Sequence, residues 1–232
     1  MSSQITVPAS TTDRHDTRPA SRARRHPAPA QFRVSLSPLL PGTDLDGSPT
    51  GYLARPDTSQ DDLDIPEALA RELAILSWTT KAVGALHPDE YIAVTVTPEV
   101  ALAPDFGRTV SKLACERLML VFETARVGRR RQTLTDAVAA ARRFGVRLGV
   151  SGQRVTSADG FDAFVVTPST CALTPPSGAA LIIAAELQTE EDLEWARSLG
   201  ADLFEGPVLV DPMTVAPVDL RRLDQFSRLS SD

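Results

Sequence analysis

Segments with the hydrophobic pattern of strands alternate with segments of helical spacing along most of the chain, and this alternation constrains the fold more than any other feature. Strands and helices that alternate with short connections favour a parallel sheet covered by helices. The expected strands are 32–40, a short one near 51–55, 91–97, 117–122, 146–150, 164–166, 180–185 and 201–204. The expected helices are 65–86, a short one within 107–115, 133–144, 190–199 and 216–229.

Local signals support these elements. Pro66 suits the first turn of a helix. Thr189 is a good N-cap, and the acidic run that follows it favours the positive end of a helix dipole. Gly200 then stops that helix. Residues 180–185 are almost entirely apolar, which is typical of a strand covered on both faces.

Seven or eight strands over about 200 residues favour a closed (β/α) barrel over an open doubly wound sheet. Neither the glycine-rich dinucleotide fingerprint nor a P-loop occurs in the chain, which argues against those nucleotide folds. The barrel should also be shortened. Only a short stretch, with Pro168, Pro175 and Pro176, separates the expected strands 164–166 and 180–185. Because proline breaks helices, one outer helix is expected to be missing there.

The charge is divided unevenly between the start of the chain and the remainder. The formal net charge is −6, yet residues 1–33 hold six arginines against Asp13 and Asp16. Residues 1–30 are also poor in large apolar side chains, so we expect a disordered basic tail before a barrel domain at 31–232. The tail is either an arm for an anionic partner or a solvating extension. The acidic remainder argues against a nucleic-acid binder.

Several function classes are excluded by composition. No apolar run approaches the roughly 20 residues that cross a bilayer, and the start of the chain lacks the apolar core of a secretory signal. Cys115 and Cys171 are too few for a disulfide framework and fit a cytoplasmic protein. Three histidines and two cysteines are also too few to predict a zinc site.

The order of several short segments resembles the EAL domains, which are bacterial cyclic-di-GMP phosphodiesterases. The similar segments are 50–55, 91–98, 144–148, 184–189 and 199–206, the last followed by Asp211 and Pro212. The resemblance covers roughly residues 32–215 and implies a TIM-like barrel. It also implies metal-assisted hydrolysis, with two divalent cations held by carboxylates and an Asn at the carboxyl ends of the strands.

The residues that the resemblance places at the metal site are mostly absent. The Glu of the family signature falls on Gly51, the Asn on Thr95, and the paired aspartates on Ser151 and Gly152. The late Gln falls on Glu205. No lysine occurs in the strand that carries one in the family. We therefore expect no metal site, no catalytic residue and no cofactor.

Two acidic residues depend on strand register. Glu123 and Glu186 each lie one residue beyond an expected acidic position. A one-residue slip turns a strand side chain to the opposite face, so each of them either lies at the rim or points into the helix layer. Together with Arg55, whose forked guanidinium suits a phosphate, the candidate ligand-binding residues are Arg55, Thr95, Glu123, Glu186 and Glu205.

Three functions remain open from the sequence. The first is an inactive EAL-like regulatory module that binds a protein partner, or cyclic-di-GMP without hydrolysis. The second is an active phosphodiesterase with Mg²⁺ or Mn²⁺ in a rearranged site formed by Glu123, Glu186 and Glu205. The third is an unrelated small barrel that binds a phosphorylated ligand at the carboxyl ends of its strands.

Overall fold

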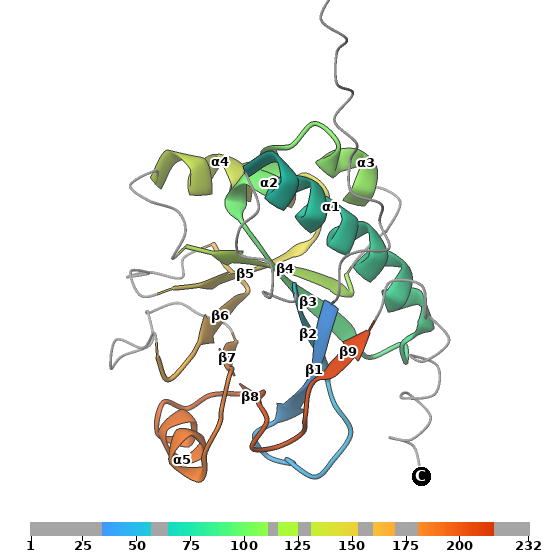
Figure 1. Cartoon of the computed structure of the whole chain (residues 1–232). Coiled ribbons are helices and arrows are strands. Elements are labelled where there is room, and N and C mark those ends of the chain that lie inside the picture. Colours follow the sequence, from blue (N-terminus) through green and yellow to red (C-terminus); the bar gives the residue numbers. More distant parts are fainter. Residues whose placement is uncertain are drawn as a thin grey trace, which may run out of the picture.

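Eight strands close into a barrel in the computed structural model, which describes residues 34–56, 65–110, 116–124, 131–152, 160–169 and 181–215 (Figure 1). In the described residues the strands of the barrel are β1 (Val34–Pro41), β2 (Gly51–Pro56), β3 (Tyr91–Val96), β4 (Leu118–Glu123), β5 (Arg147–Ser151), β6 (Ala163–Val166), β7 (Ile182–Ala184) and β8 (Leu203–Phe204). Neighbours pair in chain order, and β1 closes the barrel by pairing with both β2 and β8. The predicted barrel is confirmed.

One strand runs against the others. The pairs from β2 to β8 are parallel, whereas β1 is antiparallel to both β2 and β8. A wholly parallel sheet was therefore the wrong expectation. Residues 42–50 link β1 to β2, and this connection is too short for the crossover that a parallel pair requires. A further short strand, β9 (Met213–Val215), was not predicted and pairs antiparallel with the first residues of β1.

The helices cover the outer face of the barrel. They are α1 (Ile65–Ala82), followed by the 3₁₀ turn η2 (Val83–Ala85), then α2 (Pro98–Leu102), α3 (Phe106–Val110), α4 (Arg131–Arg142) and α5 (Glu190–Ser198). Helices α1 to α4 lie together on one side, and α5 lies on the opposite side beside β7 and β8 (Figure 1). The short helix expected within 107–115 corresponds to α3, although residues 111–115 lie outside the described ranges, and α2 was not predicted. No helix of the described ranges is long and apolar enough to cross a membrane.

Three predictions fall outside the described residues. These are the disordered tail at 1–30, the terminal helix at 216–229 and most of the shortened connection before β7.

The core has three parts, each set by strand alternation. Outward-facing residues of β1 to β5 pack against α1 to α4, with Phe106 and Phe122 among the largest buried side chains. Outward-facing residues of β5 to β8 pack against Leu193 and Ala196 of α5. The inward-facing residues fill the barrel and are Leu39, Leu53, Tyr91, Ala93, Met119, Val121, Ala163, Val165, Ile183, Ala185 and Leu203.

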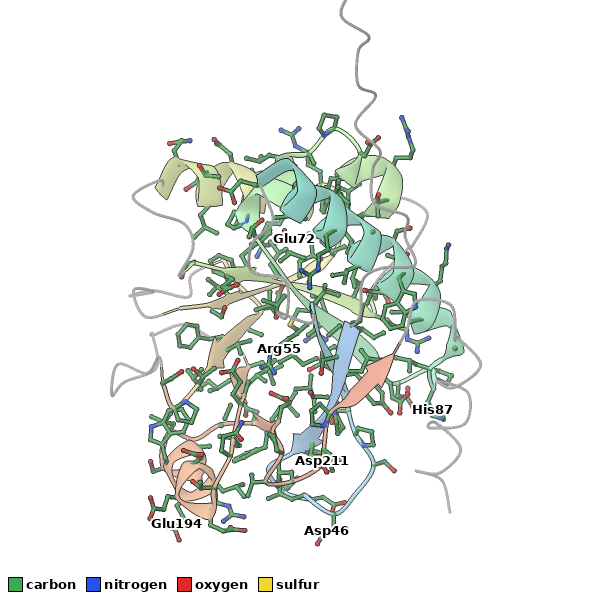
Figure 2. The ribbon with its side chains drawn as sticks, in the orientation of Figure 1. Asp46, Arg55, Glu72, His87, Glu194 and Asp211 are labelled. Carbon is green, nitrogen blue, oxygen red and sulfur yellow. The ribbon has the colours of Figure 1, made fainter. Side chains whose placement is uncertain are left out.

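A buried carboxylate joins the helix layer to the carboxyl end of β3. Glu72 of α1 accepts hydrogen bonds from the backbone N–H of Thr97 at 3.1 Å and from its hydroxyl at 2.7 Å. Thr97 is the N-cap residue of α2, so Glu72 satisfies a backbone donor that the helix leaves open. Figure 2 shows Glu72 between the helices and the strands. This contact holds the end of β3, two residues beyond Thr95.

Helix α5 begins with the predicted cap, in the form of a capping box. The N–H of Asp192 donates to the Thr189 hydroxyl, and the Asp192 carboxylate accepts from the N–H groups of Gln188 and Thr189, both at 2.9 Å. The hydrogen bond from Gln188, supported by those from Thr189, holds the pKa of Asp192 below its ordinary value of 3.8. The folded state therefore favours the ionised carboxylate.

Asp192→Asn should lower the melting temperature at about pH 7, because it removes the charge that the capping hydrogen bonds favour. A lowered folded-state pKa contributes stability above the unfolded-state pKa, and this contribution is lost as the pH falls through the folded-state value. The difference between wild type and variant should therefore shrink at about pH 3, measured by thermal unfolding. The control is Glu194→Gln, which removes a charge from the exposed side of the same helix (Figure 2). A difference that grows at low pH would contradict the prediction.

Candidate functional site at the carboxyl rim of the barrel

One inward-facing residue from each parallel strand forms a ring at the carboxyl end of the barrel. Each lies two positions after an inward-facing residue, and alternation turns it to the same face. For Ser151 this residue is Gly149, where an added Cβ would meet Val121, Met119 and Ala163 of the barrel core. Carboxyl ends of parallel strands meet at one rim, which is where barrels of this kind place their ligands. We call this ring the rim layer: Arg55, Thr95, Glu123, Ser151, Thr167, Ala185 and Glu205.

The central contact of the rim layer is a two-pronged ion pair between β2 and the end of β8. Arg55 Nη1 donates to Glu205 Oε1 at 3.2 Å, and Nη2 donates to Oε2 at 3.0 Å. Glu205 is almost fully buried, with 2% of its side chain exposed, whereas Arg55 is 24% exposed. Figure 2 shows Arg55 in the middle of the molecule, among the strands. The pair spans the seam at which β1 and β8 share only two paired positions.

Glu186 completes this group from the loop after β7. Its backbone N–H donates to Glu205 Oε2 at 3.0 Å, and its own Oε1 lies 3.8 Å from Arg55 Nη2. Glu186 has a φ of 62°, the single positive φ among the described residues other than glycine. Half of its side chain is exposed. Its carboxylate therefore lies at the rim beside Arg55, although Ala185 and not Glu186 holds the inward-facing position after β7.

The two loops that carry Glu186 and Glu205 are packed backbone to backbone. The Leu187 N–H donates to the Glu205 carbonyl at 3.1 Å, and the Val208 N–H donates to the Leu187 carbonyl at 3.2 Å. A Cβ added to Gly206 would lie 2.2 Å from the Leu187 carbonyl oxygen. Only glycine therefore fits directly after Glu205, and this close approach sets the position of the Glu205 carboxylate.

The register places Glu123 on the inner face of the barrel. Glu123 pairs with Ser151 of β5, and Val121, two residues earlier, belongs to the barrel core. Thr124 fixes the end of β4 by donating its N–H and its hydroxyl to the Ser151 carbonyl, at 2.9 and 2.7 Å. Of the two orientations left open by the sequence, Glu123 thus has the one that faces the rim.

Gly51 lies at the other end of the barrel. It pairs with Tyr91, the first residue of β3, whereas Ala54 pairs with Val94, so Arg55 is the residue of β2 level with Thr95. The position that the resemblance gives to the signature Glu thus lies at the amino end of β2, four residues before Arg55. Close packing explains the glycine at position 51, because an added Cβ would lie 2.5 Å from the Tyr91 carbonyl oxygen.

The tyrosine at this amino end is buried. The Arg147 guanidinium lies 5.1 Å from the centre of its ring. Burial raises the pKa of Tyr91 to about 12, and the charge of Arg147 acts in the opposite direction.

The rim layer does not fit a two-cation centre. Hard divalent cations require several carboxylate or carbonyl oxygens that converge on one point. Among the residues that the structure describes, no three His, Cys, Asp or Glu side chains lie close enough together to hold a metal ion. Both carboxylate oxygens of Glu205 accept from Arg55, and a guanidinium in the same ring repels a cation. Thr95, Ser151 and Thr167 offer hydroxyl groups in the remaining positions.

Comparison with known proteins identifies the fold. No family model and no curated protein sequence matches the chain. Solved structures do match. BlrP1 of Klebsiella pneumoniae, in a manganese and cyclic-di-GMP complex, is 14% identical with a TM-score of 0.63, and the match covers 79% of this chain and 56% of that one. The PaMucR phosphodiesterase in its c-di-GMP complex is 17% identical with a TM-score of 0.59 over 79% of this chain and 97% of that one.

A third structural neighbour is described as a protein with an EAL domain. The Bacillus subtilis YkuI protein, with an EAL domain, in complex with c-di-GMP and calcium, is 15% identical with a TM-score of 0.56, over 85% of this chain and 60% of that one. The barrel is therefore of the EAL type, as the sequence resemblance implied. The chain spans little more than half of the BlrP1 chain that it matches.

Proposed function

We propose that this chain is an EAL-like domain that does not hydrolyse cyclic-di-GMP and acts in signalling as a binding module for a protein partner. The observation that carries the proposal is the composition of the rim layer, in which an arginine, three hydroxyl residues and an alanine occupy five of seven positions. Its carboxylates are those of Glu123 and Glu205, and Glu205 is held by Arg55.

Hydrolysis of a phosphodiester in water needs a generated nucleophile and compensation of the phosphate charge. Two divalent cations supply both in metal-dependent phosphodiesterases. The proposed inactivity follows from the donor set, because threonine and serine hydroxyls are weak ligands for Mg²⁺ or Mn²⁺ compared with carboxylates. Glu123 and Glu186 are the acidic groups on which an active, rearranged site would depend.

Binding of the nucleotide without turnover is the less favoured form of the module. Arg55, the cation of the rim layer, faces the carboxylates of Glu205 and Glu186. These three described side chains together carry one net negative charge, which opposes a ligand with two phosphate groups. This charge balance supports a protein partner over a cyclic dinucleotide.

Calorimetric titration of the full chain with cyclic-di-GMP tests the proposal, first in Mg²⁺ or Mn²⁺ and then in EDTA, with the recovered nucleotide analysed for cleavage. PaMucR, a phosphodiesterase, serves as the positive control. We expect no saturable heat and no cleavage. Metal-dependent cleavage would overturn the proposal in favour of an active phosphodiesterase. Saturable binding that persists in EDTA would replace the protein partner with the nucleotide itself.

A further inference from the structure

We propose that Glu205 is a built-in anion that occupies the Arg55 guanidinium and excludes phosphate-bearing ligands from the mouth of the barrel. The inference rests on the proposed function, since it explains why a chain with an EAL-type barrel does not take up a cyclic dinucleotide. One autoinhibitory contact, between Glu205 and Arg55, excludes the nucleotide, and the general loss of polar groups is not the cause.

The geometry of the contact matches the way in which arginine holds a phosphate. Both terminal nitrogens of Arg55 donate to separate oxygens of Glu205, at 3.2 and 3.0 Å. A parallel pair of N–H donors binds carboxylate and phosphate oxygens in the same manner. A phosphate that approached Arg55 from the rim would therefore compete with Glu205 for the same two donors.

Glu205 is fixed in place independently of Arg55. Its N–H donates to the Ala184 carbonyl at 2.8 Å, and its carbonyl accepts from Leu187. Its carboxylate also accepts the Glu186 N–H. With 2% of its side chain exposed, Glu205 is shielded from water in this position, so Arg55 is not replaced there by solvent. A displaced Glu205 would be an unpaired buried charge, which makes displacement by an external anion costly.

The Glu205 carboxylate also competes at an advantage over a dissolved phosphate, because it belongs to the same chain as Arg55. A group held within contact distance of its partner competes as if it were present at a very high effective concentration. Glu186 adds a second negative charge 3.8 Å from Arg55 Nη2, on the exposed side of the pair. Arg55 is thus compensated on both sides before any ligand arrives.

Glu205→Gln tests the inference, because it keeps the size of the side chain and removes its charge. Calorimetric titration with cyclic-di-GMP in EDTA should show saturable binding, at least about tenfold tighter than the weakest affinity that the same titration of wild type excludes, since a charge-assisted pair no longer competes for Arg55. The gained affinity should fall with added salt. Glu205→Gln combined with Arg55→Gln should lose the gain. Glu194→Gln on the exposed side of α5 is the matched control and should change little, because it removes one negative charge and leaves Arg55 and both of its carboxylate partners intact.

A second variant keeps the test decisive if Glu205→Gln does not fold, as judged by circular dichroism and a cooperative thermal transition. Glu205→Thr places on β8 the kind of residue that β3 and β6 already carry in the rim layer, Thr95 and Thr167. Folded Glu205 variants that bind no better than wild type would overturn the inference, and so would a gain that survives removal of Arg55. Binding by wild type would overturn the proposed function together with the exclusion, whereas the outcomes above overturn the inference alone, so the two failures are distinguishable.

Discussion

Gly206→Ala is expected to lower the free energy of unfolding by at least about 3 kcal/mol, because two separate costs combine at this position. Gly206 has a φ of 153°, a region that residues with a side chain rarely adopt. The new Cβ would lie 2.2 Å from the carbonyl oxygen and 2.4 Å from the nitrogen of Leu187. These are backbone atoms, so relief requires the loop after β7 to move away from Glu205. Urea unfolding monitored by fluorescence measures the change.

Gly200→Ala is the matched control. Gly200 also has a positive φ, of 70°, but nothing lies within 4 Å of the position that its Cβ would take. Only the conformational cost remains there, about 1 kcal/mol for a left-handed residue with a side chain. If Gly206→Ala were no more destabilising than Gly200→Ala, the backbone contact between the two rim loops would not contribute to stability. The inference that close packing of these loops positions Glu205 would then be contradicted.

Arg55→Gln is expected to destabilise the fold by about 3 kcal/mol, because it leaves the carboxylate of Glu205 buried without its counter-charge. The reverse change should cost less. Glu205→Gln leaves Arg55, which is 24% exposed and is able to reach water. The two single variants of one ion pair should therefore differ, with Arg55→Gln the more damaging. Equilibrium urea unfolding of both variants measures this asymmetry.

The double variant separates the ion pair from the loss of either side chain. Arg55→Gln with Glu205→Gln should recover most of the stability lost by Arg55→Gln alone, since no unpaired charge remains. Arg108→Gln provides a surface comparison, because the Arg108–Asp105 pair at 3.3 Å is exposed on both sides and should contribute little. Equal losses in the two single variants, with no recovery in the double variant, would contradict a buried pair at the rim.

The barrel itself was predictable from local patterns. Strands of two to eight residues that alternate with amphipathic helices bury their apolar faces in few ways, and closure of the sheet is one of them. The cap at Thr189 and the end of α5 at Gly200 were also predictable, because hydrogen bonds between near neighbours determine them. The reversed direction of β1 was missed, although the short connection of residues 42–50 was a usable signal.

The candidate residues of the site were predictable as a group but not as an arrangement. Arg55, Thr95, Glu123 and Glu205 all lie in the rim layer, because each follows an apolar strand by the same alternation that fills the core. The orientation and contacts of each side chain could not be predicted from local sequence patterns. The register turned Glu123 inward, and a left-handed residue turned Glu186 back over Arg55. Whether any of them binds a ligand is tested by the titrations proposed above.

The sequence by itself determined the class of fold, the positions of most elements and the type of residue at the end of each strand, since these depend on periodicity and on contacts between near neighbours. Only the tertiary structure decided that Arg55 pairs with Glu205. The two residues are 150 positions apart, and closure of the barrel through β1 brings β2 and β8 to opposite sides of one strand. That closure depends on the packing of the whole core, which local sequence patterns do not contain. The Arg55 guanidinium, which the sequence predicted as a ligand contact, therefore binds the carboxylate of Glu205 in the same chain.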